Sequence, residues 1–178
     1  MNTAEIIDPT TSTCFITVRR EGLAAALGHD LRLEVTRHTL TATADALSAE
    51  FDAASLRVVG AISADGSLDT GALSAKDRAT IEASIRDKVL ETKRHPTVRF
   101  TAEAPTERAG GYELRGELAL HGVTKTVAVR VDEREGRLVG KVTLHQPDWR
   151  ITPFRGLLGA LRVQADVEVE VSVARRWG

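Results

Sequence analysis

The chain has 178 residues, 42% of them hydrophobic and 28% charged, with 24 basic against 25 acidic side chains and a formal net charge of -1. These values are typical of a single globular domain that is long enough to enclose a sizeable core. Nucleic acid and anionic membranes attract a clustered positive surface, so the balanced charge argues against both as partners.

Cysteine content and hydropathy limit the protein class further. Cys14 is the only cysteine, so no intramolecular disulfide is possible, and its place in an alternating strand predicts a small buried thiol. Residues 1–13 lack the basic start and apolar centre of a signal peptide, and no window has the roughly 18 apolar residues of a membrane span. We therefore expect a soluble, cytoplasmic protein.

In chain order, residues 1–11 are mostly polar and contain the turn-forming pair Asp8-Pro9, which predicts a flexible arm. Alternation of apolar and polar residues then predicts amphipathic strands. These strands are expected over residues 14–19, 29–36, 39–47, 56–62, 97–103, 110–120, 123–132, 138–144 and 161–174. The alanine-rich stretch 22–28, bracketed by glycines, suits one or two helical turns or a plug over one end of a barrel.

One helix is predicted near residues 77–92. Ser74 or Asp77 can cap its start, and apolar residues recur along one face at Ile81, Ile85, Val89 and Leu90. Pro96 prevents its continuation. A lone amphipathic helix among strands is expected across a barrel mouth or along the outside of a barrel.

The clearest hairpin lies between Gly110 and Asp132, with the chain reversing at His121 and Gly122. Glycine accepts the positive φ that such a turn requires. About eight strands with one buried face predict an all-β, antiparallel up-and-down β-barrel, or a strongly curled sandwich.

Several motifs, taken in order, resemble those of the YceI-like family. They are Gly28-His29-Asp30-Leu31, Lys88-Val89-Leu90, His95-Pro96-Thr97-Val98-Arg99-Phe100, residues 116–124 around His121-Gly122-Val123-Thr124, Gln146-Pro147-Asp148-Trp149 and Leu161-Arg162-Val163. The resemblance covers residues 13–174 and implies a YceI-like domain over residues 12–178. It also implies an extended, lipocalin-like barrel that holds a long apolar ligand of the polyisoprenoid type.

The residues offer no catalytic constellation. The five histidines show no metal-binding spacing, and the chain has neither a serine nucleophile elbow nor a glycine-rich phosphate loop. We therefore expect no enzyme activity, no bound metal and no cofactor, with a metal site assembled from distant strands as the open alternative. The alternative is an enzyme that uses His29, His121 or His145 as a base beside Asp148 or Arg150, or a haem-binding barrel with one of these histidines as axial ligand.

The small aliphatic side chains of the inner face fill space poorly, which favours an apolar tunnel. The ligand is expected to be an isoprenoid, a quinone or a fatty-acid-like chain. The residues predicted to contact it are Leu31, Leu33, Phe100, Leu114, Leu118, Val127, Val129, Val142, Leu144, Phe154, Leu157, Leu158, Val163 and Val167. Within the irregular segment 153–159, Phe154, Leu157 and Leu158 are expected to cover one mouth and to touch the ligand or a second subunit of a homodimer.

Overall fold

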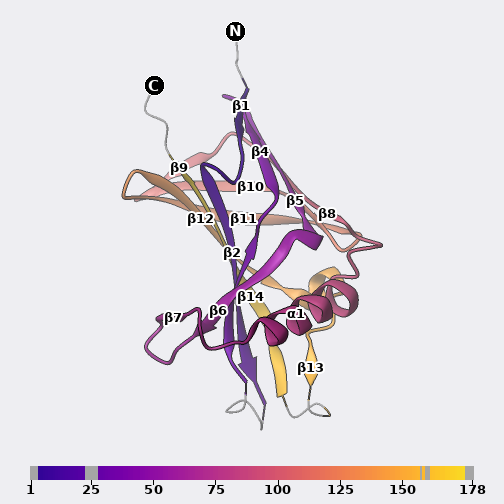
Figure 1. Ribbon diagram of the computed structural model, residues 1–178. Coiled ribbons are helices and arrows are strands. Elements are labelled where there is room, and N and C mark those ends of the chain that lie inside the picture. Colours follow the sequence, from indigo (N-terminus) through magenta and orange to yellow (C-terminus); the bar gives the residue numbers. More distant parts are fainter. Residues whose placement is uncertain (1–3, 23–27, 157, 159–160, 175–178) are drawn as a thin grey trace.

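The computed structural model describes residues 4–22, 28–156, 158 and 161–174, and within these residues the chain forms one curled antiparallel sheet with one main helix (Figure 1). The strands are β1 Glu5–Ile7, β2 Ser12–Glu21, β3 Asp30–Val35, β4 His38–Ala42, β5 Ala46–Asp52, β6 Leu56–Ile62, β7 Leu68–Asp69, β8 Thr97–Glu103, β9 Thr106–Arg108, β10 Gly111–Leu120, β11 Val123–Arg134, β12 Arg137–His145, β13 Arg155–Gly156 and β14 Leu161–Ala174. The all-β antiparallel prediction is confirmed. The strands number fourteen among the described residues instead of about eight.

The hydrogen-bonded order is β1-β4-β5-β8-β10-β11-β12-β14-β2-β3-β6-β7, with the short strands β9 and β13 added beside β10 and β14. The longest strand, β14, pairs with β12 along one edge and with β2 along the other. Its register against β2 shifts between Val163 and Val167. Such an irregularity bends a long strand, which allows β14 to follow the curl of the sheet.

One long bent hairpin connects the two sides of the curled sheet. Only Thr36 and Arg37 separate β3 from β4, and the short 3-10 helix η2, Ala53–Ser55, joins β5 to β6. One half of this hairpin adds to the sheet edge at β8 and the other half to the edge at β2. Figure 1 shows β4 in the upper half of the molecule and β6 running toward its lower half. The enclosure is therefore completed by continuous chain and not by a full ring of strand pairs.

Hydrogen bonds fix the bend of this hairpin. The backbone N–H of Asp52 donates to the Arg37 carbonyl at 3.0 Å, and the fully buried Ser55 hydroxyl accepts from the Arg37 N–H at 3.0 Å. The Arg37 guanidinium donates to Asp52 Oδ2 at 2.6 and 2.9 Å. The buried polar groups at the corner therefore have hydrogen-bond partners, as buried polar groups require where strands are interrupted.

The predicted helix is present as α1, Ala75–Ser84, which continues as a π-helical stretch, η3, Ile85–Val89. Of the two predicted caps, Ser74 is the N-cap, and its hydroxyl accepts a hydrogen bond from the Asp77 N–H at 3.1 Å. The apolar residues Leu73, Ile81, Ile85 and Leu90 pack against a core cluster of Leu33, Leu56 and Val58. No helix in the described part of the chain has the length and apolar character needed to cross a membrane.

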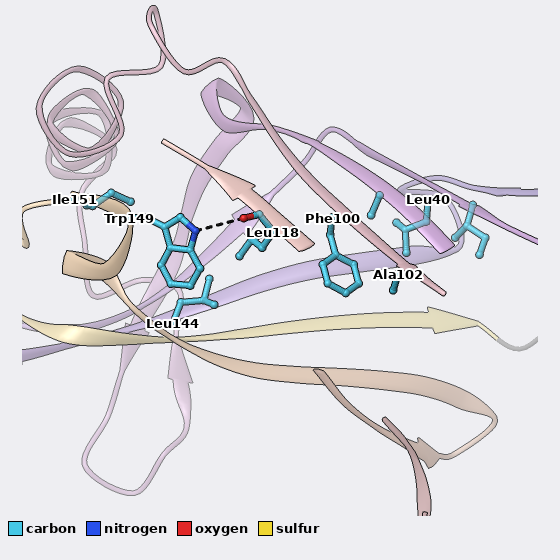
Figure 2. Packing of buried hydrophobic residues seen from close by; sticks show 9 residues of the cluster. Leu40, Phe100, Ala102, Leu118, Leu144, Trp149 and Ile151 are labelled. Carbon is cyan, nitrogen blue, oxygen red and sulfur yellow. Dashed lines mark hydrogen bonds between the residues drawn. The ribbon is translucent and has the colours of Figure 1, made fainter. Parts of the chain in front are cut away.

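A larger core cluster extends along the sheet, and Figure 2 shows it around Phe100, Leu118 and Trp149. The Trp149 indole is 3% exposed, and its Nε1–H donates to the Leu118 carbonyl at 3.4 Å. Trp149 belongs to the 3-10 helix η4, Gln146–Trp149. A buried indole needs such a partner, so this bond orients the ring against the sheet.

Two sequence predictions about the first part of the chain are wrong. Residues 5–7 are not a loose arm, because they form β1 on β4 and bury Ile7. The strand expected over residues 39–47 is divided by a turn, with β4 ending at Ala42 and β5 starting at Ala46. The alternation of alanines continues through this turn, so the sequence pattern did not predict it. The stretch expected as helical turns or a plug, residues 23–27 in particular, lies outside the described residues.

Candidate functional site

The curled sheet and the helix enclose a cavity of about 740 Å³. Its wall is formed by every second side chain of the strands, as the period of two requires. On β2 these are Cys14, Ile16 and Val18, and on β12 they are Leu138, Val142 and Leu144. The helical face adds Leu73, Ile81, Ile85, Val89 and Leu90. The lining is therefore aliphatic over most of its length.

The cavity wall includes most of the side chains that the sequence predicted as ligand contacts. These are Leu31, Leu33, Phe100, Leu114, Leu118, Val127, Val129, Val142, Leu144, Phe154, Val163 and Val167. Leu158 does not line the cavity; it has a φ of 54° and a fully exposed side chain. Leu157 lies outside the described residues. Of the three residues expected over one mouth, Phe154 is thus the one that the structure places on the wall.

Many of the lining valines are only half-buried, although they face inward. Val127, Val129, Val142 and Val169 pack against the larger core cluster on one side. Their remaining surface borders the cavity. Side chains of a close-packed core would leave no such surface. The interior beside these side chains is therefore hollow, and members of both core clusters line it.

Residues from loops and from the helix line the cavity where alternation could not predict them. Trp149 and Ile151 come from η4 and the segment after it, and Ile7 comes from the first strand. Cys14 was predicted as a small buried thiol, and it lies on the wall with 3% exposure. Burial, and to a lesser degree the charge of Glu34, raises the pKa of the Cys14 thiol to about 12. The thiol is therefore protonated and unreactive at neutral pH.

The charged side chains of the described cavity wall come from one end of it, where β2 pairs with β14. Arg20, His29 and Arg162 line it there, and the Arg20 guanidinium donates to the Gly28 carbonyl. The backbone N–H of Arg20 donates to Asp30 Oδ1 at 2.9 Å, and Arg162 Nε lies 3.8 Å from Glu21 Oε1. Both arginines are thus partly paired and partly exposed, which leaves a polar rim at the end of an apolar cavity.

The three histidines proposed as alternative catalytic groups do not meet. His29 is at the polar rim, while His145 Nδ1 lies 2.6 Å from Asp166 Oδ1 on the exposed surface. His121 is nearly buried at the β10–β11 turn, where Nδ1 lies 3.1 Å from the Trp149 carbonyl oxygen.

In the alternative enzyme role, Asp148 and Arg150 were the expected partners of these histidines, and they are separate from them as well. Within the described ranges no hydrogen bond or ion pair joins any of these three histidines to Asp148 or Arg150. Asp148 instead pairs with Lys125 at 3.7 Å. A base and its orienting partner would need such a contact.

Known proteins share this architecture. The model of a family described as the YceI-like domain matches residues 6–174. No curated protein sequence matches the chain at a significant level. Among solved structures, Burkholderia cenocepacia BcnA is similar with a TM-score of 0.64 and 13% identity, over 94% of this chain and 98% of its own.

Two further structures are similar. A polyisoprenoid-binding domain from Saccharophagus degradans, implicated in plant cell wall breakdown, has a TM-score of 0.60 and 13% identity, over 98% of this chain and 99% of its own. The Campylobacter jejuni YceI protein has a TM-score of 0.50 and 12% identity, over 82% and 85% of the two chains. At identities this low, the structural similarity shows a shared fold alone.

Proposed function

The chain belongs to the YceI-like family, and from that premise we propose that it binds a long apolar ligand in its interior and carries or sequesters it without chemical change. The ligand class is a polyisoprenoid, a quinone or a fatty-acid-like chain. One structural relative is described as a polyisoprenoid-binding domain, which supports the first of these.

The observation that carries the proposal is the hollow aliphatic interior. A volume of about 740 Å³ is within the range of pockets that hold small organic ligands. It would accommodate about 25 water molecules at roughly 30 Å³ each, but the aliphatic wall offers them few hydrogen-bond partners. Each ligand methylene buried there contributes about 0.8 kcal/mol. A chain of ten methylenes would thus gain about 8 kcal/mol, which corresponds to roughly micromolar affinity before the entropic costs of binding.

The distribution of polar groups supports one orientation of an amphiphilic ligand. Its hydrocarbon chain lies between the valines of β11, β12 and β14, and its polar group lies at the rim formed by Arg20, His29 and Arg162. Burying the polar group between the core clusters would leave it without hydrogen bonds, which costs several kcal/mol.

Catalysis is not part of the proposal, because the candidate catalytic side chains lie apart. The separate surroundings of His121 and His145 support a binding role over an acid–base role. His29, which lines the cavity, is the one histidine placed to ligate a haem iron in the alternative haem-binding role. A purified protein without visible absorption would eliminate that alternative.

The test is to identify what the purified protein contains. Native mass spectrometry should show a mass excess, and solvent extraction followed by lipid mass spectrometry should recover one long-chain lipid class at near-stoichiometric amounts. The delipidated protein should then rebind that lipid. If no lipid is recovered and the delipidated protein binds no long-chain probe, the proposal fails.

Two further predictions go with this function. A homodimer is still predicted, with the exposed Leu158 as the available apolar contact from segment 153–159; light scattering after size exclusion measures it. A cytoplasmic location also stays a prediction, and fractionation of the source cells tests it.

A further inference from the structure

Outside the cavity, three potential metal ligands from two distant parts of the chain converge. Glu91 and His95 lie in the turns after η3, and His121 is at the turn between β10 and β11. One ligand atom of each lies within 4.8 Å of the others. The rings of His95 and His121 are 4.4 Å apart between centroids and inclined by 51°.

The hydrogen bonds of His121 determine which of its nitrogens is free. Nδ1 lies 3.1 Å from the Trp149 carbonyl oxygen, which can only accept, so Nδ1 carries the hydrogen. In a neutral ring Nε2 then carries a lone pair and is an acceptor. This nitrogen lies 3.2 Å from Glu91 Oε2, which is a second acceptor. Two acceptors at this distance repel each other unless a proton or a cation lies between them.

Metal-binding histidines share this arrangement. Such a histidine usually donates its other ring N–H to a backbone carbonyl or a carboxylate, which fixes the tautomer and the ring orientation. Ligand atoms at about 2.0–2.1 Å from a tetrahedral ion are roughly 3.3 Å apart. The distance of 3.2 Å between Nε2 and Oε2 fits one edge of that tetrahedron.

The neighbouring residues leave the ligand atoms available. Arg94 donates to Glu91 Oε1 at 2.9 Å, which leaves Oε2 directed at His121. The His95 ring lies against the turn, and a Cβ on Gly122 would be 3.1 Å from His95 Cε1. Glycine at this position therefore allows the ring its close approach to His121.

We propose that Glu91, His95 and His121 bind a divalent transition-metal ion of the zinc type. Its ligands are Glu91 Oε2, His121 Nε2 and one ring nitrogen of His95, and a water molecule occupies the fourth position. Two imidazoles and one carboxylate suit zinc, cobalt or nickel better than calcium or magnesium, which prefer oxygen ligands.

The site would connect the end of the helical segment to the sheet. Leu90, Leu120 and Trp149 adjoin its residues in sequence or by hydrogen bond, and all three line the cavity. A bound ion would therefore hold the helical wall of the cavity in place. This proposal stands on the cluster alone, independently of which ligand the cavity contains.

Zinc binding to tag-free, metal-stripped protein tests the proposal, with calorimetry or a competing fluorescent chelator as the assay. His95→Phe removes one ligand but keeps an aromatic ring beside His121. Glu91→Gln removes the anionic ligand but can donate a hydrogen bond to Nε2. His145→Phe is the matched control, because His145 and Asp166 form a two-residue histidine–carboxylate pair on the surface.

We expect one zinc ion per chain, with affinity reduced at least about tenfold in His95→Phe and in Glu91→Gln and unchanged in His145→Phe. Cobalt should give the visible absorption of a tetrahedral site in the wild type and lose it in both cluster variants. Circular dichroism shows whether each variant is folded. If His95→Phe does not fold, Glu91→Gln alone provides the comparison with the wild type. Absence of saturable zinc binding, or equal affinity in the folded cluster variants and the wild type, overturns the proposal.

Discussion

Val142→Trp should obstruct the cavity without unfolding the protein. Val142 is half-buried, pairs with Val169 across β12 and β14, and both side chains border the cavity. A larger side chain at this position extends into open space. The substitution should therefore destabilise the protein less than overpacking a dense core does, which costs roughly 1–3 kcal/mol. We expect the free energy of unfolding to fall by less than about 1 kcal/mol.

The effect on binding should be larger than the effect on stability. If the indole displaces about three methylenes of a bound chain, the loss is about 2.4 kcal/mol at 0.8 kcal/mol each. A tenfold change in affinity corresponds to about 1.4 kcal/mol, so affinity should decrease by about 50-fold.

The assay is titration of delipidated protein with a fluorescent polyene fatty acid, alongside urea unfolding. Thr143→Trp is the control, since the neighbouring side chain is exposed on the outer face and absent from the cavity wall. The control should bind the probe as the wild type does. Equal probe affinity in Val142→Trp and in the control would refute the reasoning, because the ligand would then lie elsewhere.

The remaining predictions concern the hairpin turn and the buried thiol. Gly122→Ala should lower the free energy of unfolding by about 1–2 kcal/mol for its φ of +75°, and by a further amount for the contact of 3.1 Å with His95. Gly136→Ala, with a φ of +73° and no atom within 4 Å of the added Cβ, bears only the backbone cost; equal losses in urea unfolding would rule out the contact. Cys14, with its pKa raised to about 12, should be alkylated far more slowly at pH 8 in the folded protein than in guanidinium, where the thiol returns to its ordinary pKa; equal rates would contradict its burial.

Local patterns in the sequence were sufficient for most of the longer strands and for the helix. Alternation identified the inward side chains of β2, β10, β12 and β14, because neighbouring residues of a strand point to opposite faces. The turn at His121 and Gly122 was readable from glycine, and both residues have positive φ. The helix was readable from its apolar face and from Ser74, although its π-helical end was not.

The sequence missed features that depend on position along a strand and not on the period. The sequence prediction ended one strand at residue 36 and began the next at residue 39. Alternation alone did not show that this break, which contains no proline or glycine, is the corner of a bent hairpin. Trp149 and Ile151 lie in an irregular segment with no period, and their place on the cavity wall depends on packing.

The sequence by itself determined most of the longer strands, their buried faces and the antiparallel class, because these follow from patterns among residues near one another in the chain. Whether the buried faces meet or leave a cavity was decided by the tertiary structure, since the spacing across the sheet depends on its curl and on the bent hairpin. The same holds for the cluster of Glu91, His95 and His121. Its members are up to 30 residues apart, and only the packing of the helical segment against the β10–β11 turn brings their side chains together.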